Sequence, residues 1–567
     1  MLKLLTLLIN ERLRKWAESA NILPDSQNGI RPKYRNNNNS FILRCAIKRA
    51  RASGKALYIV FVDLENAFPS TDLSILWTKL YSAGVSGPLL DWLRSVYAAM
   101  TYIVRHGGDL SDTFTSLLGL LTGDIASPGL WNIFFSDLSI PDHADDVLLN
   151  HRPVSHIEQA DDVAVFTTSP HGLQYKMDAF QRWCSLNRMI ISTVKTKWSV
   201  ARHGPTDSDG IRITVAGIPI EFVTYYTYVG ITFDFANSSM FQKHSKTKTS
   251  AAQGISGATF TIDSFVGIIP PPEGRKLYMA RIDPHLIHGC DVILDTNRAA
   301  LNELENVQRT FIRRMLHLSA RSLLHPLCGI PELYLLSCPP PHCLAYAALM
   351  DSINLAQTHP HDRTSSWVKD LIKVCAQLPD PVHVNADTLT DTAPLLSHLI
   401  ESSARTSLQA LWDNSTKLVF RTRGHDATQR RMQPYLKIPD PQHRHALTRL
   451  LLSDHLLAVE QLRCHRFSRG RIEQHHRLCC FCHLAIEDEV HTLFGCRSND
   501  RLLSARDRFL DTLFHHNPRL CVLFLSAPAT QFVDFPVNHT KTLKPFAAYV
   551  HQIFAIYDEV PMCIPTI

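Results

Sequence analysis

The sequence lacks the features that define several common classes of protein. Its apolar start, 1–9, is followed at once by charged residues, and no run reaches 18 apolar residues. We therefore expect an intracellular protein with no secretory signal, no transmembrane helix and no membrane partner. No glycine-rich phosphate loop follows the first predicted strand, which excludes a doubly wound nucleotide-binding fold. Hydrophobic residues make up 45% and charged residues 19% of the 567 residues, which excludes wholesale disorder.

Cysteine is too sparse for a disulfide scaffold. The 14 cysteines are scattered, except that Cys479, Cys480, Cys482 and Cys496 fall within 18 residues. Disulfide-rich secreted domains are shorter and denser in cysteine, so this pattern indicates a reducing compartment and one local metal site. The net charge of +6 is concentrated in one segment, because residues 417–474 carry 12 Lys and Arg against 5 Asp and Glu. A basic segment beside a Cys/His cluster is typical of a nucleic-acid contact.

Strand and helix signals alternate over residues 1–235, which predicts a mixed α/β fold. The apolar run 56–63 ends in an aspartate and predicts a buried strand. Shorter strands are expected at 101–106, 163–167 and 223–233.

Helix start and stop signals lie between these strands. Ser70 or Thr71 is expected to cap a helix that stops at Gly84. Ser127 is expected to cap another helix, with Pro128 as its first residue. Further helices are expected at 89–100, at 173–184 and over most of 240–330, and an amphipathic helix near 440 precedes the cysteine cluster.

Three aspartates suggest a metal site. Asp63 ends the buried strand, and Asp161-Asp162 stands between His156-Ile157 and the strand VAVF. Adjacent carboxylates repel each other unless a divalent cation lies between them. Mg²⁺ prefers oxygen ligands, and with a third carboxylate from Asp63 the pair would form a two-metal site for phosphoryl transfer.

An aspartate pair on its own is most often a solvated turn, and the chain contains a second one. Asp145-Asp146 follows Pro141-Asp142-His143, which breaks any incoming strand. The later pair lies between two apolar segments, as a hairpin requires. We therefore favour Asp161-Asp162 as the metal-binding pair.

Five motifs follow one another along the chain: FVDLENAFPS (61–70), TGDIASPGLWNIFFSDL (122–138), QADD (159–162), NRMIISTVKTKW (187–198) and YTYVGITFD (226–234). They resemble the ordered motifs of reverse transcriptases, and LPDSQNGIRP (23–32) resembles the fingers segment of these enzymes. Their order and spacing are most similar to those in the polymerase protein of non-LTR (LINE-like) retrotransposons. Fungal elements in particular have similar motif sequences. The resemblance covers about residues 10–320.

The resemblance implies an α/β (α+β) polymerase right hand. Partial fingers and the palm would occupy 1–235, and a thumb-like helical region 236–350. A helical connector would follow over 351–440. The mainly helical C-terminal region, 441–567, would hold a basic helix and a small zinc-binding tail.

The function that the resemblance implies is RNA-directed DNA polymerisation in the nucleus, with an RNA template, a DNA primer or target, dNTPs and two Mg²⁺ ions. Because Met1 falls inside the first polymerase segment, the chain resembles an N-terminally truncated element. The alternative is a catalytically inactive remnant that retains only zinc-dependent nucleic-acid binding. A group II intron maturase or telomerase-type enzyme shares the motifs, but the cysteine tail and the truncation argue against it.

The resemblance also assigns roles to residues. Asp63, Asp161 and Asp162 would bind the two Mg²⁺ ions, and Lys195 would protonate the pyrophosphate leaving group, with Lys197 as the alternative. The residues implied in nucleotide or template binding are Phe68, which would exclude a 2′-hydroxyl, and Arg31, Gly123, Ser127, Pro128 and Gln159. The implied primer grip is Tyr228, Val229 and Gly230. Two positions depart from the family pattern, Thr122 in place of glutamine and Gln159 in place of Tyr or Phe.

The spacing Cys479-x2-Cys482-x8-His491-x4-Cys496 offers three thiolates and one imidazole. This is a closed tetrahedral set, as in structural zinc sites, and one Zn²⁺ would replace the core that so short a segment cannot build. A single helix is expected to present His491 and Cys496, and the register leaves Cys480 and His483 as alternative ligands. The preceding basic residues, expected to contact nucleic acid, are Arg444, Arg449, Arg463, Arg466, Arg469 and Arg471.

Overall fold

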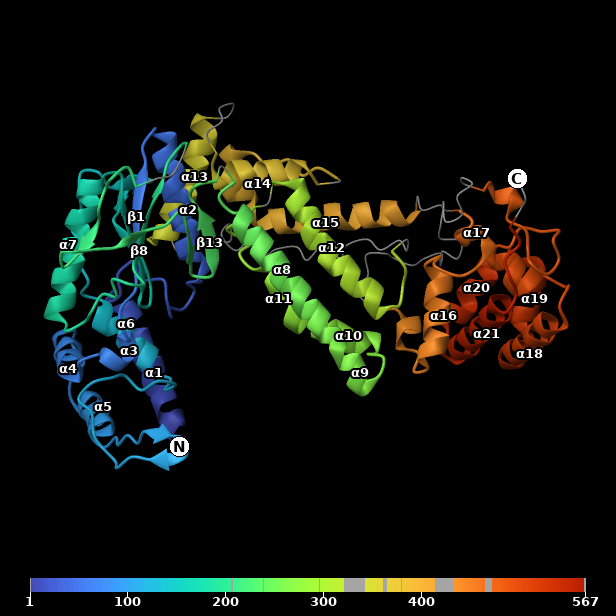
Figure 1. Ribbon diagram of the computed structural model, residues 1–567, viewed down its shortest axis with the longest axis horizontal. Coiled ribbons are helices and arrows are strands. Elements are labelled where there is room, and N and C mark those ends of the chain that lie inside the picture. Colours follow the sequence, from blue (N-terminus) through green and yellow to red (C-terminus); the bar gives the residue numbers. More distant parts are fainter. Residues whose placement is uncertain are drawn as a thin grey trace. The chain divides into compact units, whose positions relative to one another are not determined.

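The computed structural model places the described chain in two compact units, whose elements are labelled in Figure 1. The described residues are 2–204, 208–237, 239–294, 296–320, 342–359, 365–378, 380–413, 432–463 and 472–564. The first unit comprises the described residues of 1–247, 289–297 and 330–400, and the second those of 248–288, 298–329 and 401–567. Arg466, Arg469 and Arg471 lie outside the described residues. None of the described helices is long and apolar enough to cross a membrane.

A five-stranded sheet forms the centre of the first unit, in the strand order β11-β8-β1-β7-β6. The strands are β1 (Leu57–Val62), β6 (His156–Gln159), β7 (Asp162–Thr167), β8 (Lys197–Ala201) and β11 (Glu221–Phe222). All pairs are antiparallel except β11 with β8. The predicted strands at 56–63 and 163–167 are confirmed as β1 and β7.

The apolar run of β1 is explained by its central place, because both faces of the strand are buried. Leu57, Ile59 and Phe61 contribute to one hydrophobic core, and Val60 and Val62 contribute to the other. Successive side chains of a strand point to opposite faces, so a strand covered on both sides has no polar positions.

Helices cover both faces of the sheet. One core contains residues of α2 (Asn37–Ala52), α13 (Leu344–Thr358) and α14 (Trp367–Ala376). The other contains residues of α1 (Leu2–Ser19), α4 (Leu73–Ser82), α5 (Pro88–Ala98), α6 (Ser127–Phe135) and α7 (Pro170–Leu186). The remaining short elements of this unit are α3 (Ala67–Ser70), β2 (Arg105–His106), β3 (Asp109–Leu110), β4 (Val147–Leu149), β5 (Arg152–Val154), β9 (Thr214–Val215) and β10 (Ile218–Pro219).

Helices α13 and α14 lie far along the chain, yet they complete the core around α2. Arg49 of α2 donates from Nε to both carboxylate oxygens of Asp351, at 2.9 Å each. The ring of Trp367 packs edge-on against Phe41 at 5.5 Å, and its Nε1 donates to the carbonyl of Asp291 at 2.9 Å. The described residues of 342–400 are therefore part of the unit that carries the central sheet.

The expected cap of the helix after β1 is wrong. The residue at the cap of α4 is Asp72, whose carboxylate accepts hydrogen bonds from the N–H groups of Ser74 and Ile75. The hydroxyls of Ser70 and Thr71 instead donate to carbonyls of the preceding segment. Ser, Thr and Asp all serve as caps, so three candidates in a row cannot be separated by type.

The start of α6 also differs in detail from the prediction. Ser127 is the first helical residue and makes no capping bond, and Ala126 precedes it at the cap position. The carboxylate of Asp124 accepts from the N–H of Ala126 at 3.0 Å. Pro128 stands in the first turn, where its missing N–H costs nothing.

Two of the expected strands are shorter or divided. Within 101–106 only Arg105–His106 is a strand, β2, which pairs with β3. The run 223–233 contains a hairpin of β12 (Tyr225–Tyr228) and β13 (Ile231–Asp234). Val229 and Gly230 form its two-residue turn with φ of 47° and 80°, as a tight hairpin requires.

The second unit is mainly helical. Its first helices are α9 (Asp263–Val266), α10 (Pro271–Leu277), α11 (Asp283–Ile287) and α12 (Arg298–Met315). Helices α8 (Gln242–Thr259) and α15 (Leu389–Asp413) belong partly to each unit. The C-terminal helices are α16 (Pro441–Leu451), α17 (Ala458–Gln461), α18 (Asp500–His516), α19 (Arg519–Ser526), α20 (Ala529–Asn538) and α21 (Thr540–Asp558).

The C-terminal helices build a hydrophobic core of their own. Helix α21 packs against α16, α18 and α20. Buried side chains of α21, such as Phe546, Val550 and Ile553, share one cluster with Cys479 and Cys496. The expectation that this segment is too short to build a core is therefore wrong, because helices beyond the cysteine motif supply the apolar area.

We predict that Trp367→Ala lowers the free energy of unfolding of the first unit by about 3–5 kcal/mol, the usual cost of truncating a buried Trp or Phe. Trp367 is 1% exposed and would leave a cavity against Phe41. Urea unfolding of the full chain checks this, with Trp92→Ala, a half-buried residue of α5, as the control. Equal losses in both variants would contradict a shared core of α2 and α14.

Candidate active site and metal centre

Asp63, Asp161 and Asp162 come together at one end of the central strands. Asp63 directly follows β1, and the register Val62↔Val163 sets it beside the start of β7. Gln159 pairs with Asp162, so Ala160 and Asp161 form the two-residue turn between β6 and β7. Ala160 has a φ of +58°, which this tight turn requires.

The three carboxylates repel one another. Burial and the charges of Asp161 and Asp63 raise the pKa of Asp162 to about 6. Burial and the charge of Asp63 likewise raise the pKa of Asp161. Oδ2 of Asp63 is enclosed and accepts no hydrogen bond from the described residues. Neighbouring carboxylates that raise one another's pKa fit a divalent cation such as Mg²⁺, which supplies the missing positive charge.

The two candidate lysines differ in their contacts. Lys195 is exposed, and its Nζ lies 3.5 Å from Oδ2 of Asp63. Lys197 is bound elsewhere, since its Nζ donates to Glu221 and to the carbonyl of Val194 at 2.5 Å. The geometry therefore favours Lys195 as the lysine of the site.

A buried clamp holds the turn that carries the aspartates. The amide of Gln27 accepts from the N–H of Ala160 at 2.9 Å and donates to its carbonyl at 3.2 Å. Nε2 of Gln27 also donates to Glu158, whose carboxylate accepts from Ser26 at 2.6 Å. Nδ2 of Asn39 donates to the carbonyl of Glu158 at 2.8 Å. Sequence reasoning missed Glu158 and Asn39, because their partners are more than 100 residues away.

Hydrogen bonds with buried residues also fix the backbone of Asp63. Its N–H donates to Oγ1 of the buried Thr196 at 3.1 Å, and its carbonyl accepts from the N–H of Ser192 at 2.9 Å. Tyr226 stacks on Phe61 at 4.1 Å, and burial and the charges of Asp162 and Asp63 raise its pKa. Thr196 and Tyr226 were also missed, although both lie inside the motifs used for the prediction.

The residues expected along the nucleotide path differ in exposure. Phe68 is half-buried and stacks on Trp131 at 5.3 Å. Gly123 is exposed with a φ of +85°, and Pro128 is half-buried. Ser127 is buried, with its hydroxyl 3.4 Å from that of Tyr97.

Arg31 is engaged inside the protein. Its guanidinium donates to both carboxylate oxygens of Glu18, at 3.0 and 2.8 Å. It also donates to the carbonyls of Pro24 and Gln27, at 2.8 and 3.0 Å. Arg31 is 8% exposed, so most of its donors hold this segment together.

The expected primer-grip residues lie beside the aspartate turn. The buried hydroxyl of Tyr228 donates to the carbonyls of Ile157 and Asp162, at 3.4 and 3.3 Å. The amide of Gln159 is held by Asn36 and Asn39, at 2.9 and 3.1 Å.

The second aspartate pair, Asp145-Asp146, makes contacts with residues at and near the start of α7. Asp146 forms a buried ion pair with Lys176 of α7. The carboxylate of Asp145 accepts from the hydroxyl of Ser169 at 2.6 Å, next to the start of the same helix. These contacts support the choice of Asp161-Asp162.

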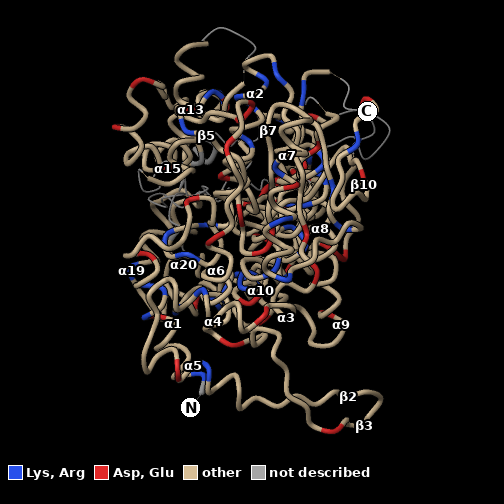
Figure 2. Tube along the Cα trace, turned by 90° about the vertical axis from the view of Figure 1, so that its left-hand side faces the viewer, with Lys and Arg blue, Asp and Glu red and all other residues tan. Residues whose placement is uncertain are grey.

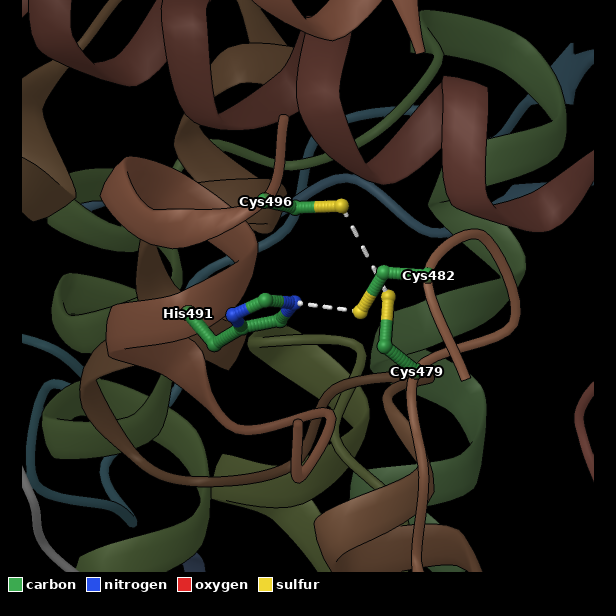
Figure 3. A group of neighbouring side chains, drawn as sticks. All are labelled: Cys479, Cys482, His491 and Cys496. Atoms are coloured by element: carbon green, nitrogen blue, oxygen red, sulfur yellow. Dashed lines mark hydrogen bonds between the residues drawn. The ribbon is translucent and has the colours of Figure 1, made fainter. Parts of the chain in front are cut away.

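The Cys/His cluster is the second site (Figure 3). The ligand atoms of Cys479, Cys482, His491 and Cys496 all lie within 4.8 Å of one another. Sγ of Cys479 is 3.8 Å from that of Cys496, and Sγ of Cys482 is 3.4 Å from Nε2 of His491. Three sulfurs and one imidazole nitrogen around a common centre fit a tetrahedral Zn²⁺.

The alternative ligands lie outside this four-residue group. Cys480 is buried, and its backbone N–H donates to the carboxylate of Glu487 at 2.8 Å. His491 begins a short π-helical turn, His491–Gly495, and Cys496 follows it directly. The expected single helix is therefore found, as a π-helical turn with Cys496 at its C-terminal cap.

The basic segment before the cluster is only partly described. Within it, Arg444 is 3% exposed and donates to the carbonyls of Ile438 and Pro439. It is therefore unable to contact phosphate, which corrects the sequence expectation. Arg449 and Arg463 are bound to the carbonyl of Asp454 and to Glu460. Along the described trace, basic and acidic residues are mixed (Figure 2).

Residues 1–233 match the family model described as reverse transcriptase (RNA-dependent DNA polymerase). This part of the chain is therefore similar to reverse transcriptases, and Asp63, Asp161 and Asp162 all lie within the matched residues. No curated protein matches the sequence.

Among solved structures, the chain is similar to a telomerase from Candida albicans in complex with the TWJ fragment of telomeric RNA. The identity is 11% and the TM-score 0.34, with 72% of this chain and 57% of that chain covered. The chain thus spans little more than half the length of that telomerase chain. A likeness at this level assigns neither fold nor partner to this chain.

We predict that Asp162→Asn relieves the repulsion among the three carboxylates and also abolishes Mg²⁺ binding, and the two effects can be measured separately. In EDTA the variant should melt at the wild-type temperature or about 1–2 °C higher, the shift that about 1 kcal/mol gives in a unit of this size. Mg²⁺ should stabilise the wild type and not the variant, because a ligand stabilises only the protein that binds it. Calorimetric melting checks this, with the exposed Asp178→Asn as control. Mg²⁺ stabilisation of Asp162→Asn would exclude Asp162 as a ligand.

Proposed function

We propose that the chain is an RNA-directed DNA polymerase of a non-LTR retrotransposon, of the fungal type, acting in the nucleus. The observation that carries the proposal is the convergence of Asp63, Asp161 and Asp162 inside the part of the chain that is similar to reverse transcriptases. Its partners would be an RNA template, a DNA primer or target and dNTPs. Fingers and palm would lie in 1–235 and the thumb in 236–350.

The chain's own residues support this chemistry in distinct ways. Asp63, Asp161 and Asp162 would hold two Mg²⁺ ions, which stabilise the attacking and leaving oxygens of a phosphoryl displacement. Lys195, whose Nζ lies 3.5 Å from Oδ2 of Asp63, would donate a proton to the departing pyrophosphate. Gln27 keeps the aspartate turn in position by binding both backbone groups of Ala160.

The same proposal assigns the neighbouring residues. Phe68, backed by Trp131, would pack against the sugar and exclude a 2′-hydroxyl. The primer end would rest on the hairpin turn of Tyr228, Val229 and Gly230. The template and nucleotide would be contacted by Gly123, Ser127, Pro128 and Gln159, and Arg31 would act through the segment that it holds together.

We predict that the full chain extends a DNA primer on an RNA template with dNTPs and Mg²⁺. Asp161→Asn should reduce extension on the order of 1000-fold or more, which corresponds to about 4 kcal/mol of lost transition-state stabilisation. Nucleic-acid affinity should be retained, because the ions act mainly in the transition state. Asp145→Asn, outside the site, should extend normally. A wild-type chain that binds nucleic acid without extending primers would favour the inactive-remnant alternative.

We also propose that Cys479, Cys482, His491 and Cys496 hold one structural Zn²⁺ in a region that contacts nucleic acid. The closed set of four ligand atoms within 4.8 Å supports this. A closed site contributes its metal-binding free energy to folding.

We predict one Zn²⁺ per full-length chain by elemental analysis. Cys482→Ser should lose the metal and lower the melting temperature of the second unit, since metal affinity is part of its stability. The control is Cys521→Ser, a partly exposed cysteine of α19 outside the group, which should keep the metal. Zinc retained at wild-type affinity in Cys482→Ser would contradict the ligand assignment.

A further inference from the structure

We infer that Tyr557 of helix α21 is a positioning residue of the zinc centre, whose hydroxyl donates a hydrogen bond to the thiolate of Cys479. Through this bond the last helix of the described chain is fastened to the metal site. The inference rests on the zinc site proposed above and extends it to a residue outside the ligand motif.

The contact is short and buried. Oη of Tyr557 lies 3.5 Å from Sγ of Cys479, and the two residues are 2% and 0% exposed. Sγ of Cys496 is 3.8 Å from Sγ of Cys479, so the phenol faces a pair of ligand sulfurs. The ring packs edge-on against Phe481, with the ring centroids 4.9 Å apart and an interplanar angle of 86°.

The direction of this hydrogen bond follows from chemistry. A metal-bound cysteine is a thiolate, which accepts hydrogen bonds and has no proton to donate. The phenol of Tyr557 must therefore be the donor. A buried hydroxyl without a partner costs free energy, so the tyrosine in turn depends on the sulfur.

The other donors to Cys479 come from the ligand loop itself. The backbone N–H groups of Phe481 and Cys482 point at its sulfur. Tyr557 instead comes from α21, which packs against α16 and α18. The tyrosine thus connects the metal site to the helical core, and partners of this kind set the orientation and electron density of metal ligands.

We test this in the full chain with Tyr557→Phe, which removes only the hydroxyl. Replacing Zn²⁺ by Co²⁺ makes the sulfur-to-metal charge-transfer absorption visible. Without the hydrogen bond the thiolate is a better electron donor, so the band should move to longer wavelength. Zn²⁺ affinity, measured by competition with a chelator, should fall about 10-fold, the lower end of the usual loss for such partners.

The matched control is Tyr549→Phe, on the same helix. Tyr549 is 3% exposed, and its hydroxyl donates to the carbonyl of Leu493, not to sulfur. That carbonyl keeps a second donor, because Nε of Arg506 lies 2.9 Å away. Tyr549→Phe should leave the Co²⁺ band at its wild-type position, whatever it does to stability.

A second variant keeps the test independent of folding. Replacing Tyr557 with 3-fluorotyrosine retains the ring and makes the hydroxyl a stronger donor, so the band should move to shorter wavelength. Unchanged bands in both Tyr557 variants, with wild-type Zn²⁺ affinity in Tyr557→Phe, would overturn the inference and leave the zinc site standing. A wild-type chain that binds neither Zn²⁺ nor Co²⁺ through sulfur would overturn the zinc site and the inference together.

Discussion

The mutual repulsion of three carboxylates is the constraint on which the first unit depends. Asp161 lies in the two-residue turn, Asp162 begins β7, and Asp63 follows the end of β1 beside them. Nothing within the trio compensates this charge, so rigid surroundings must hold it. Those surroundings are the paired strands β1 and β7, the amide of Gln27 on the turn, and the buried Thr196 behind Asp63. The fold thus stores an unfavourable arrangement that a cation can relieve.

The features of the fold and the site that the sequence could predict are those that depend on residues close together in the chain. An apolar run that ends in Asp63 and two adjacent aspartates before a strand are local patterns, and both elements were found in place. The clamp of Gln27 and Glu158 spans 131 residues, so it exists only once the chain is folded. The cap of α4 was missed for a different reason, because three residues of suitable type stand in a row and only the backbone course selects Asp72.

For the Cys/His cluster too, the local pattern was predictable from the sequence and the long-range contacts were not. Ligand spacing identified Cys479, Cys482, His491 and Cys496, since four ligands in a short segment need little long-range information. The surroundings of the cluster could not be read from the motif. Buried residues of α18 and α21 enclose Cys479 and Cys496, so the site is set into a helical core and is not an isolated knuckle.

Both units are discontinuous in sequence, and this has a consequence for how the protein folds during synthesis. The first unit is completed by residues up to 400, whereas the second already begins at 248. The ribosome therefore releases part of the second unit before α13 and α14 can cover the apolar face of α2 and β1. The two units cannot fold one after the other from the N-terminus, and nascent chains shorter than about 400 residues expose that face. An exposed apolar face of this kind makes a nascent chain prone to aggregation.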